Sequence, residues 1–202
     1  MDIANQLYQH GAVKFGRFTL KSGQVSPVYL DLRVVPSDPK LFSALVDLAL
    51  EKLESLLVDG VVGIATGGLV WSSVLAYRAG LPHFYVREEA KSHGTGSQIE
   101  GGSPAHLRDP LIVDDVATSG ASLVRAVRTL ESHGLKPKKA LVVVDREQGA
   151  SDLLGSSGVT LTSCFTLTDI LGKLGGVVPA EELEVVLKWH MEQKSRVGKT
   201  GM

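Results

Sequence analysis

Three short apolar runs constrain the fold of this chain more than any other feature, and they occupy 61–65, 111–113 and 140–144. Strands with unbroken apolar runs are typical of parallel sheets that are covered on both faces. Helical patterns follow the first two runs, over 66–79 and 119–133. This alternation predicts an α/β fold with a doubly wound, mostly parallel sheet and flanking helices.

The pattern around these runs predicts further elements. Asp38 followed by Pro39 indicates a helix start, because Asp caps a helix and Pro favours its first position. Gly134 stands where a C-terminal glycine cap belongs. The remaining expectations are a helix over 3–10, strands over 16–20, 28–33 and 83–86, a closing helix over 178–191, and a polar, frayed end over 193–202.

The composition excludes several classes of protein. The 202 residues include 21 basic and 22 acidic ones, and a net charge of -1 argues against a general nucleic-acid binder. The chain has no apolar stretch of the roughly 20 residues that a membrane span needs, and no secretory signal pattern. We therefore expect a cytoplasmic protein without membrane or nucleic-acid partners. The single Cys164 excludes an intrachain disulfide and a multi-thiolate metal site, and is expected to be a small buried side chain.

The segment from Pro110 to Ser122 carries the strongest chemical signal. An apolar strand ends in two adjacent carboxylates, Asp114 and Asp115, and a loop of small and hydroxyl-bearing residues then opens a helix. Backbone N–H groups at a helix N-terminus suit a phosphate, and paired carboxylates suit sugar hydroxyls. A helix cap beside a solvated acid is the simpler alternative, which the loop 118–120 weakens. The loop is neither a Walker motif nor a dinucleotide fingerprint.

Three further segments could bind an anionic substrate. Arg87, Lys91 and His93 lie in a glycine-rich stretch, which is either a mobile lid or a surface hairpin. Lys21 lies in a turn, where it is either solvated or a second cation for a pyrophosphate. Arg146 follows a predicted strand and is either an ordinary ion-pair partner or a bidentate ligand for a carboxylate.

Together these segments resemble the motifs of a known family. The run 114–120 resembles the phosphoribosyl pyrophosphate (PRPP) loop of type I phosphoribosyltransferases. Three further segments are similar to those of orotate phosphoribosyltransferases in particular: 18–23 with 26–27, 87–94, and 145–149.

The resemblance implies a type I phosphoribosyltransferase fold with a small N-terminal hood. It implies transfer of the phosphoribosyl group from PRPP to orotate, giving orotidine 5'-monophosphate and pyrophosphate in de novo UMP synthesis. It also implies Mg2+ as cofactor, with few direct protein ligands, and a homodimer whose lid reaches into the neighbouring active site. We expect one domain overall, divided into a hood segment 1–35, a PRPP-binding core 36–176, and a C-terminal helix and tail 177–202.

The resemblance also assigns roles to individual residues. Thr118 and Arg146 would contact orotate, Arg146 at its carboxylate. Asp114 and Asp115 would bind the ribose hydroxyls and favour the developing oxocarbenium ion. Four residues are expected to be catalytic: Lys91, His93, Asp114 and Asp115. PRPP would be bound by Lys21, Thr66, Gly67, Arg87, Lys91, His93, Asp114, Asp115, Val116, Ala117, Thr118, Ser119, Gly120, Ala121 and Ser122.

Two departures from the family pattern bear on PRPP affinity. The residue after Arg87 is usually Lys in the family and is Glu88 here, and the turn at Thr66 and Gly67 lacks the family's Tyr and Lys. Two other functions stay open at this point. One is a phosphoribosyltransferase for another nucleobase, which would offer Arg146 no carboxylate. The other is a PRPP-binding regulator without turnover.

Overall fold

The computed structural model describes residues 2–19, 23–87 and 98–200, with side chains through 196. Its centre is a six-stranded sheet with the strand order β5-β4-β3-β6-β7-β8. All neighbouring strands are parallel except β5, which is antiparallel to β4. The predicted doubly wound, mostly parallel sheet is therefore confirmed. The strands are β3 (Gly60–Ile64), β4 (His83–Val86), β5 (Ile99–Glu100), β6 (Pro110–Ala117), β7 (Lys139–Asp145) and β8 (Thr160–Thr166).

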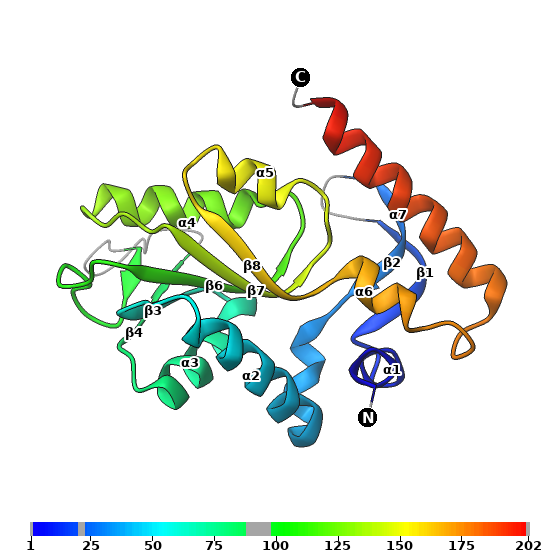
Figure 1. Ribbon diagram of the computed structural model, residues 1–202, viewed down its shortest axis with the longest axis horizontal. Coiled ribbons are helices and arrows are strands. Elements are labelled where there is room, and N and C mark those ends of the chain that lie inside the picture. The colour runs from blue at the N-terminus through cyan, green and yellow to red at the C-terminus, as the bar shows by residue number, and fades with distance from the viewer. Residues whose placement is uncertain (1, 20–22, 88–97, 201–202) are drawn as a thin grey trace.

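Helices cover both faces of this sheet (Figure 1). Successive side chains of a strand point to opposite faces, so Val61 packs in one core cluster and Val62 in the other. The first cluster includes α2 (Pro39–Glu54) and α3 (Gly67–Ala79), and the second includes α4 (Ala121–Ser132) and α5 (Ala150–Gly155). Both faces are thus buried, which explains why the strand sequences are apolar throughout.

A separate layer flanks the sheet at one end. It contains α1 (Ile3–Gln9), the antiparallel hairpin of β1 (Val13–Thr19) and β2 (Val25–Leu30), and the 3-10 helix η1 (Leu32–Ser37). The C-terminal elements α6 (Leu167–Gly172) and α7 (Ala180–Thr200) lie beside it, and α7 contacts β2 (Figure 1).

The helix caps read from the sequence are confirmed. The Asp38 carboxylate accepts hydrogen bonds from the backbone N–H groups of Lys40 at 2.9 Å and Leu41 at 3.2 Å. Gly134 has a φ of +82° just after α4, as a left-handed C-terminal cap requires. Cys164 is partly buried against the core, and this burial raises the pKa of its thiol to about 12.

Two expectations are wrong. Both hairpin strands begin three residues before the expected 16–20 and 28–33, and β1 ends one residue before 20. The second strand ends three residues before 33, because Asp31 accepts a hydrogen bond from the Arg33 N–H and turns the chain into η1. The end of the chain is not frayed over 193–200, since α7 continues there. The Gln193 side chain accepts a hydrogen bond from the Gln24 Nε2 at 3.0 Å, and Lys194 forms an ion pair with Glu147 at 2.7 Å.

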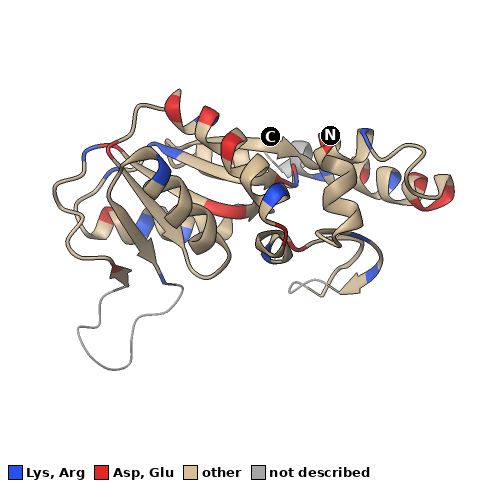
Figure 2. Cartoon of the chain, turned by 90° about the horizontal axis from the view of Figure 1, so that it is seen from below, with Lys and Arg blue, Asp and Glu red and all other residues tan. Residues whose placement is uncertain are grey.

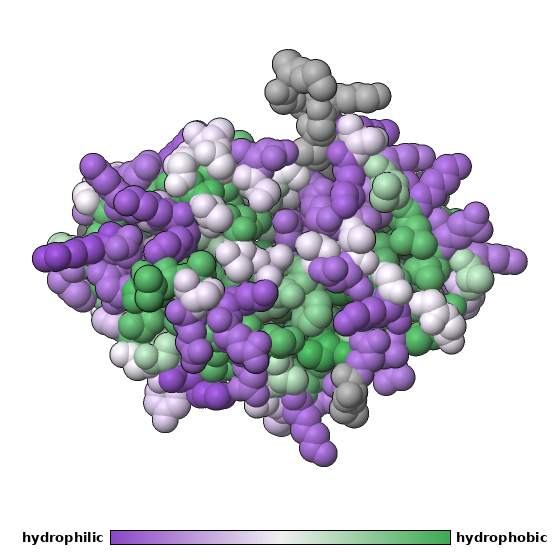
Figure 3. Space-filling model, in the orientation of Figure 1, coloured by the Kyte–Doolittle hydropathy of each residue, from purple (hydrophilic) through white to green (hydrophobic). Residues whose placement is uncertain are grey.

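Charged and apolar side chains are both widely distributed over the surface. Figure 2 shows Lys and Arg interspersed with Asp and Glu, in line with the net charge of -1. On the face in Figure 3, hydrophobic side chains form separate patches among hydrophilic ones. Within the described ranges, no helix has the length and apolar character to cross a membrane.

Candidate active site

A cavity of about 540 Å³ opens at the carboxyl ends of β3 and β6, where open parallel sheets bind ligands. Most of the predicted site residues line it. They are Thr66, Gly67, Asp114, Asp115, Val116, Thr118, Ser119, Gly120, Ala121, Ser122 and Arg146. Segments from three separate turns thus contribute to one space.

The two carboxylates lie on β6 itself, because this strand runs beyond the apolar run 111–113 as far as Ala117. Asp114 is only 6% exposed and accepts hydrogen bonds from the Asp115 N–H at 3.0 Å and the Ser122 hydroxyl at 3.4 Å. Asp115 accepts one from the Val116 N–H at 2.8 Å. Burial raises the pKa of both carboxyls, and Asp115 adds to the rise at Asp114. The cavity thus has a carboxylate wall, and hydroxyl donors or a developing cation bound there would stabilise its ionised form.

The turn after β6 leads directly into α4. Gly120 has a φ of +83°, and a Cβ there would lie 2.9 Å from the Cα of Ala150, so only glycine fits. No side chain caps the N-terminus of α4 in the described part of the chain. Its first N–H groups are therefore available to a ligand, beside the hydroxyl-bearing Thr118 and Ser119 that also line the cavity.

The turn after β3 packs against the acid pair. The Ala65–Thr66 peptide bond is cis, and α3 begins at Gly67. A Cβ on Gly67 would lie 2.6 Å from the Asp115 Oδ2, and one on Gly68 would lie 2.6 Å from the Val113 carbonyl oxygen. The paired glycines therefore allow this turn to approach the carboxylates closely.

Arg146 enters the cavity from the end of β7 and is only 5% exposed. Its backbone N–H donates to the Ala117 carbonyl at 2.9 Å, which joins the two strand ends. Its Nη2 lies 3.4 Å from the Ser26 Oγ, whereas its Nε is buried without a partner among the described residues. Burial lowers the pKa of this guanidinium. A buried cation with an unused donor is suited to a ligand carboxylate.

Three further residues of the cavity wall, Tyr29, Asp31 and Arg33, were not among the predicted site residues. Arg33 donates from Nε to Asp31 at 2.7 Å and from Nη2 at 3.1 Å, and its Nη2 also lies 3.3 Å from the Tyr29 hydroxyl. The Asp31 hydrogen bonds raise the pKa of Arg33. These residues lie within the predicted strand 28–33, and in the structure Asp31 and Arg33 follow the end of β2. However, β2 is antiparallel, so the rule for parallel strand ends does not cover it.

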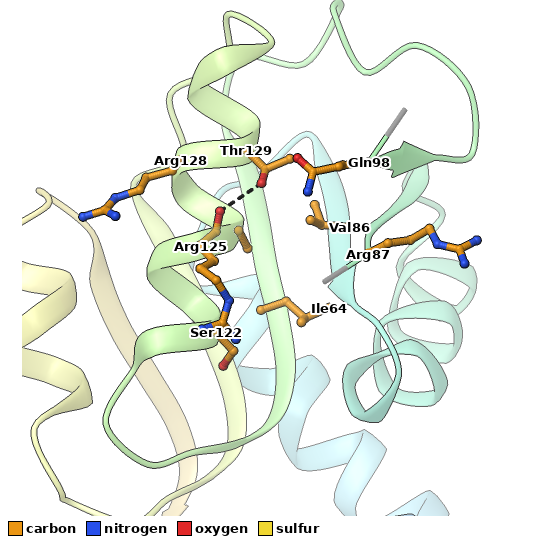
Figure 4. A pocket seen from close by; sticks show the side chains of 9 residues that line it. Ile64, Val86, Arg87, Gln98, Ser122, Arg125, Arg128 and Thr129 are labelled. Carbon is orange, nitrogen blue, oxygen red and sulfur yellow. Dashed lines mark hydrogen bonds between the residues drawn. The ribbon is translucent and has the colours of Figure 1, made fainter. Parts of the chain in front are cut away.

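Other predicted site residues lie elsewhere. Ala117 is buried in the core and is not part of the cavity lining. Arg87 lines a neighbouring cavity of about 230 Å³ (Figure 4). Its Nη1 lies 3.7 Å from the Glu100 Oε1. The two cavities share Ile64, Ser122 and Arg125. Three of the expected cationic residues lie outside the described residues, namely Lys21, Lys91 and His93. Glu88 also lies outside them.

The carboxylate wall could take part in holding a divalent cation. Mg2+ is usually bound by one or two carboxylates together with substrate phosphates. Asp114 and Asp115 supply two such groups. Over the residues that the structure describes, no cluster of three or more His, Cys, Asp or Glu could bind a metal alone. The residues present thus fit a cation that arrives with a phosphorylated ligand.

Comparison with known proteins identifies the family. The phosphoribosyl transferase domain model matches residues 37–160. An orotate phosphoribosyltransferase of Aeropyrum pernix is 45% identical over 86% of this chain and 93% of its own length. This chain belongs to the orotate phosphoribosyltransferase family. The resemblance predicted from the motifs is therefore confirmed, and the family is one of phosphoribosyl-transferring enzymes.

Solved structures agree with this family assignment. The crystal structure of the Aeropyrum pernix orotate phosphoribosyltransferase is 44% identical, with a TM-score of 0.77 over 87% of this chain and 99% of that one. Leishmania donovani UMP synthase is 28% identical, with a TM-score of 0.84 over 94% of this chain and 42% of that one. An adenine phosphoribosyltransferase of Thermoanaerobacter pseudethanolicus, at 20% identity and a TM-score of 0.59 over 76% of this chain and 95% of that one, shows the fold alone.

Proposed function

We propose that this chain catalyses the transfer of a phosphoribosyl group from PRPP to orotate, giving orotidine 5'-monophosphate and pyrophosphate. One observation carries the proposal beside the family assignment. A single cavity holds the acid pair 114–115, the uncapped start of α4 and the buried Arg146. These three features match the hydroxyls, the 5'-phosphate and the base carboxylate of the substrates.

Each feature has a defined task in this reaction. The bond from the sugar carbon to pyrophosphate breaks as a bond to the orotate ring nitrogen forms, and that nitrogen gives its proton to the departing pyrophosphate or to water. Asp114 and Asp115 bind the ribose hydroxyls and stabilise the positive charge that grows on the sugar. The N–H groups and hydroxyls of 117–122 bind the 5'-phosphate. Arg146 and Thr118 orient orotate, Arg146 through its carboxylate.

The remaining assignments follow from the family resemblance. The pyrophosphate is bound by Lys21, Thr66, Gly67, Arg87, Lys91 and His93. Two of these, Lys91 and His93, also have a catalytic role. The chain acts in the cytoplasm as a homodimer whose lid serves the neighbouring site. It is divided into the hood segment 1–35, the core 36–176 and the C-terminal segment 177–202. Mg2+, bound with PRPP, neutralises charge on the pyrophosphate.

A kinetic assay tests the proposal. The full chain is expected to form orotidine 5'-monophosphate from orotate, PRPP and Mg2+. Binding of PRPP without turnover would instead favour a regulator. Replacing Arg146 by Ala is expected to raise the KM for orotate by about 10- to 100-fold, the range for lost hydrogen bonds to charged groups. The KM for PRPP should stay within about twofold, because PRPP offers Arg146 no carboxylate.

A matched arginine variant controls for general effects. Arg108 is exposed and precedes β6 at its amino end, whereas the cavity opens at the carboxyl end. Arg108→Ala should leave both KM values unchanged. An Arg146→Ala enzyme that loses affinity for orotate and PRPP equally would contradict the role of Arg146 in base recognition.

A further inference from the structure

Helix α7 reaches the segment that carries Arg146. The Arg146 guanidinium carbon lies 5.9 Å from the centre of the Trp189 ring, within the range of a cation–π interaction. The next residue of the helix, His190, is only 1% exposed and contacts Glu147, which follows Arg146 in the chain. The last helix of the fold therefore contacts both residues at the end of β7.

Glu147 is the centre of this contact. Its Oε1 accepts a hydrogen bond from the Lys194 ammonium at 2.7 Å, and its Oε2 lies 3.1 Å from the His190 Nε2. The same Oε2 accepts hydrogen bonds from the Thr168 N–H at 3.0 Å and from the Thr168 hydroxyl. We call Glu147, Thr168, His190 and Lys194 the Glu147 cluster.

The backbone at Glu147 depends on this cluster. Its φ is +57°, a left-handed conformation that is uncommon for residues other than glycine. Side-chain bonds to α6 and α7 hold the residue in this conformation, and its N–H donates to the Asp145 carboxylate at 2.8 Å. The direction in which the chain leaves β7, and with it the position of Arg146, is therefore fixed from the helices.

Arg146 itself has few other side-chain contacts. Its guanidinium contacts the ring of Trp189. Within the described structure, the guanidinium makes only one hydrogen bond, a long one of 3.4 Å to the Ser26 hydroxyl. A guanidinium that kept more partners would have fewer donors for a ligand, whereas one with none would adopt several rotamers. An aromatic face restrains the guanidinium plane without using its N–H groups.

We propose that Trp189 and the Glu147 cluster are positioning residues that hold the Arg146 guanidinium in the orientation that receives the base carboxylate. This inference rests on the proposed function, because it assigns Arg146 to the carboxylate of orotate. It makes α7 part of the base site, although no residue of α7 lines the cavity.

Two substitutions at Trp189 separate positioning from packing. Trp189→Leu keeps an apolar side chain but removes the aromatic face, and Trp189→Phe keeps such a face. With the full chain, Trp189→Leu is expected to raise the KM for orotate roughly fivefold, the size of a partly desolvated cation–π contact. The kcat and the KM for PRPP should stay unchanged, and Trp189→Phe should restore the KM for orotate to within about twofold.

A third variant tests the Glu147 cluster without touching the core. The Lys194 side chain is 36% exposed, so Lys194→Met removes the ion pair at a site that tolerates an apolar chain. It should raise the KM for orotate in the same selective way. Met191→Ala on the same helix, at a side chain that is 61% exposed, is the matched control and should behave as the unmodified enzyme.

The outcomes are distinguishable. An unmodified chain that converts no orotate would overturn the proposed function itself. An active enzyme whose Trp189→Leu and Lys194→Met variants keep the normal KM for orotate would overturn only the positioning role. A uniform loss in both KM values and kcat, with no rescue by Trp189→Phe, would show that α7 serves packing alone.

Discussion

Asp114 illustrates how a residue that is proposed to serve chemistry can oppose folding. Its carboxyl is buried beside Asp115, and both the burial and the neighbouring charge disfavour its ionised form. Hydrogen bonds from the Asp115 N–H and the Ser122 hydroxyl offset part of this cost. A cation forming on a bound sugar would offset more of it, since it would place an opposite charge against the pair.

Replacing Asp114 by Asn is therefore expected to stabilise the protein while abolishing most of its activity. A carboxyl whose pKa is raised in the folded state binds its proton more tightly when folded. Its contribution to stability is thus lost as the pH rises above the ordinary value of 3.8 and through the raised pKa. Asn does not titrate and so loses no stability as the pH rises. The melting temperature of Asp114→Asn should therefore exceed that of the unmodified protein by a difference that grows over this pH window and then stays constant.

Thermal unfolding of both proteins across this pH range measures the effect. Glu147 and Asp145 titrate in both proteins and cancel in the difference, whereas the coupled titration of Asp115 is part of the measured effect. A variant that is less stable than the unmodified chain at neutral pH would contradict this account of Asp114.

Gly67 makes a second prediction at the scale of one residue. A Cβ at this position would lie 2.6 Å from the Asp115 carboxylate oxygen, so Gly67→Ala must displace either the turn or the carboxylate. We expect kcat/KM for PRPP to fall by about 10- to 100-fold, the size of effect that follows displacement of a reacting group by about 1 Å.

Gly155→Ala is the control for Gly67→Ala. A Cβ at Gly155 would meet no atom within 4 Å, so this variant should keep full activity. Steady-state kinetics with varied PRPP distinguish the two substitutions. Equal activity of the Gly67→Ala and Gly155→Ala enzymes would mean that the approach of the two turns is unimportant.

At the scale of elements, α2 depends on its N-cap. Asp38 accepts two backbone hydrogen bonds and also lies 2.7 Å from the His10 ring. Asp38→Ala is expected to lower the melting temperature by about 2–4 °C, which corresponds to the loss of a typical cap in a chain of this size. Asp38→Asn keeps an acceptor at the cap and should lose less. Equal destabilisation by Ala and Asn would point to the charge and the His10 contact instead of the cap.

The sequence predicted the central elements well and the flanking ones poorly, for physical reasons. The strands β3, β4 and β7 and the helix α3 could be read because their apolar runs and turn residues agree with the tertiary structure. The strand β8 was missed because the polar residues of Thr160–Thr166 interrupt its apolar pattern at the sheet edge. The second half of α7 was missed because it is held by distant side chains, not by an apolar stripe.

The same difference applies to the site. The acid pair and the small-residue turn after it are local features, and both line the cavity as the motif predicts. The contacts of Arg146 with Ser26 and Trp189 join positions far apart in the chain. No local pattern encodes such contacts, so the sequence could nominate Arg146 but could not show what surrounds it.

At the scale of the whole molecule, the proposed homodimer can be tested by complementation. Lys91→Ala is expected to lower the rate strongly without unfolding the chain, and Asp115→Ala should also be inactive. If the lid of one subunit completes the site of the other, mixed dimers contain one intact site. A random equal mixture should then regain about a quarter of the unmodified activity.

The complementation is measured as product formation by the mixed sample. Each variant alone, taken through the same mixing procedure, provides the baseline. Verified mixed dimers without activity would show that Lys91 acts within its own subunit.

The placement of Asp114 and Asp115 within β6 has a consequence for motion. The strand pairs with β7 at Asp114, and again just after Asp115 at Val116 and Ala117. The backbone of the carboxylate wall can therefore shift only if β6 separates from β7. Amide hydrogen exchange should accordingly be slow along β6, with or without ligand. If Asp114 and Asp115 bind the sugar as proposed, the sugar aligns to a fixed pair of carboxylates, and any movement during the reaction takes place in the segments around them.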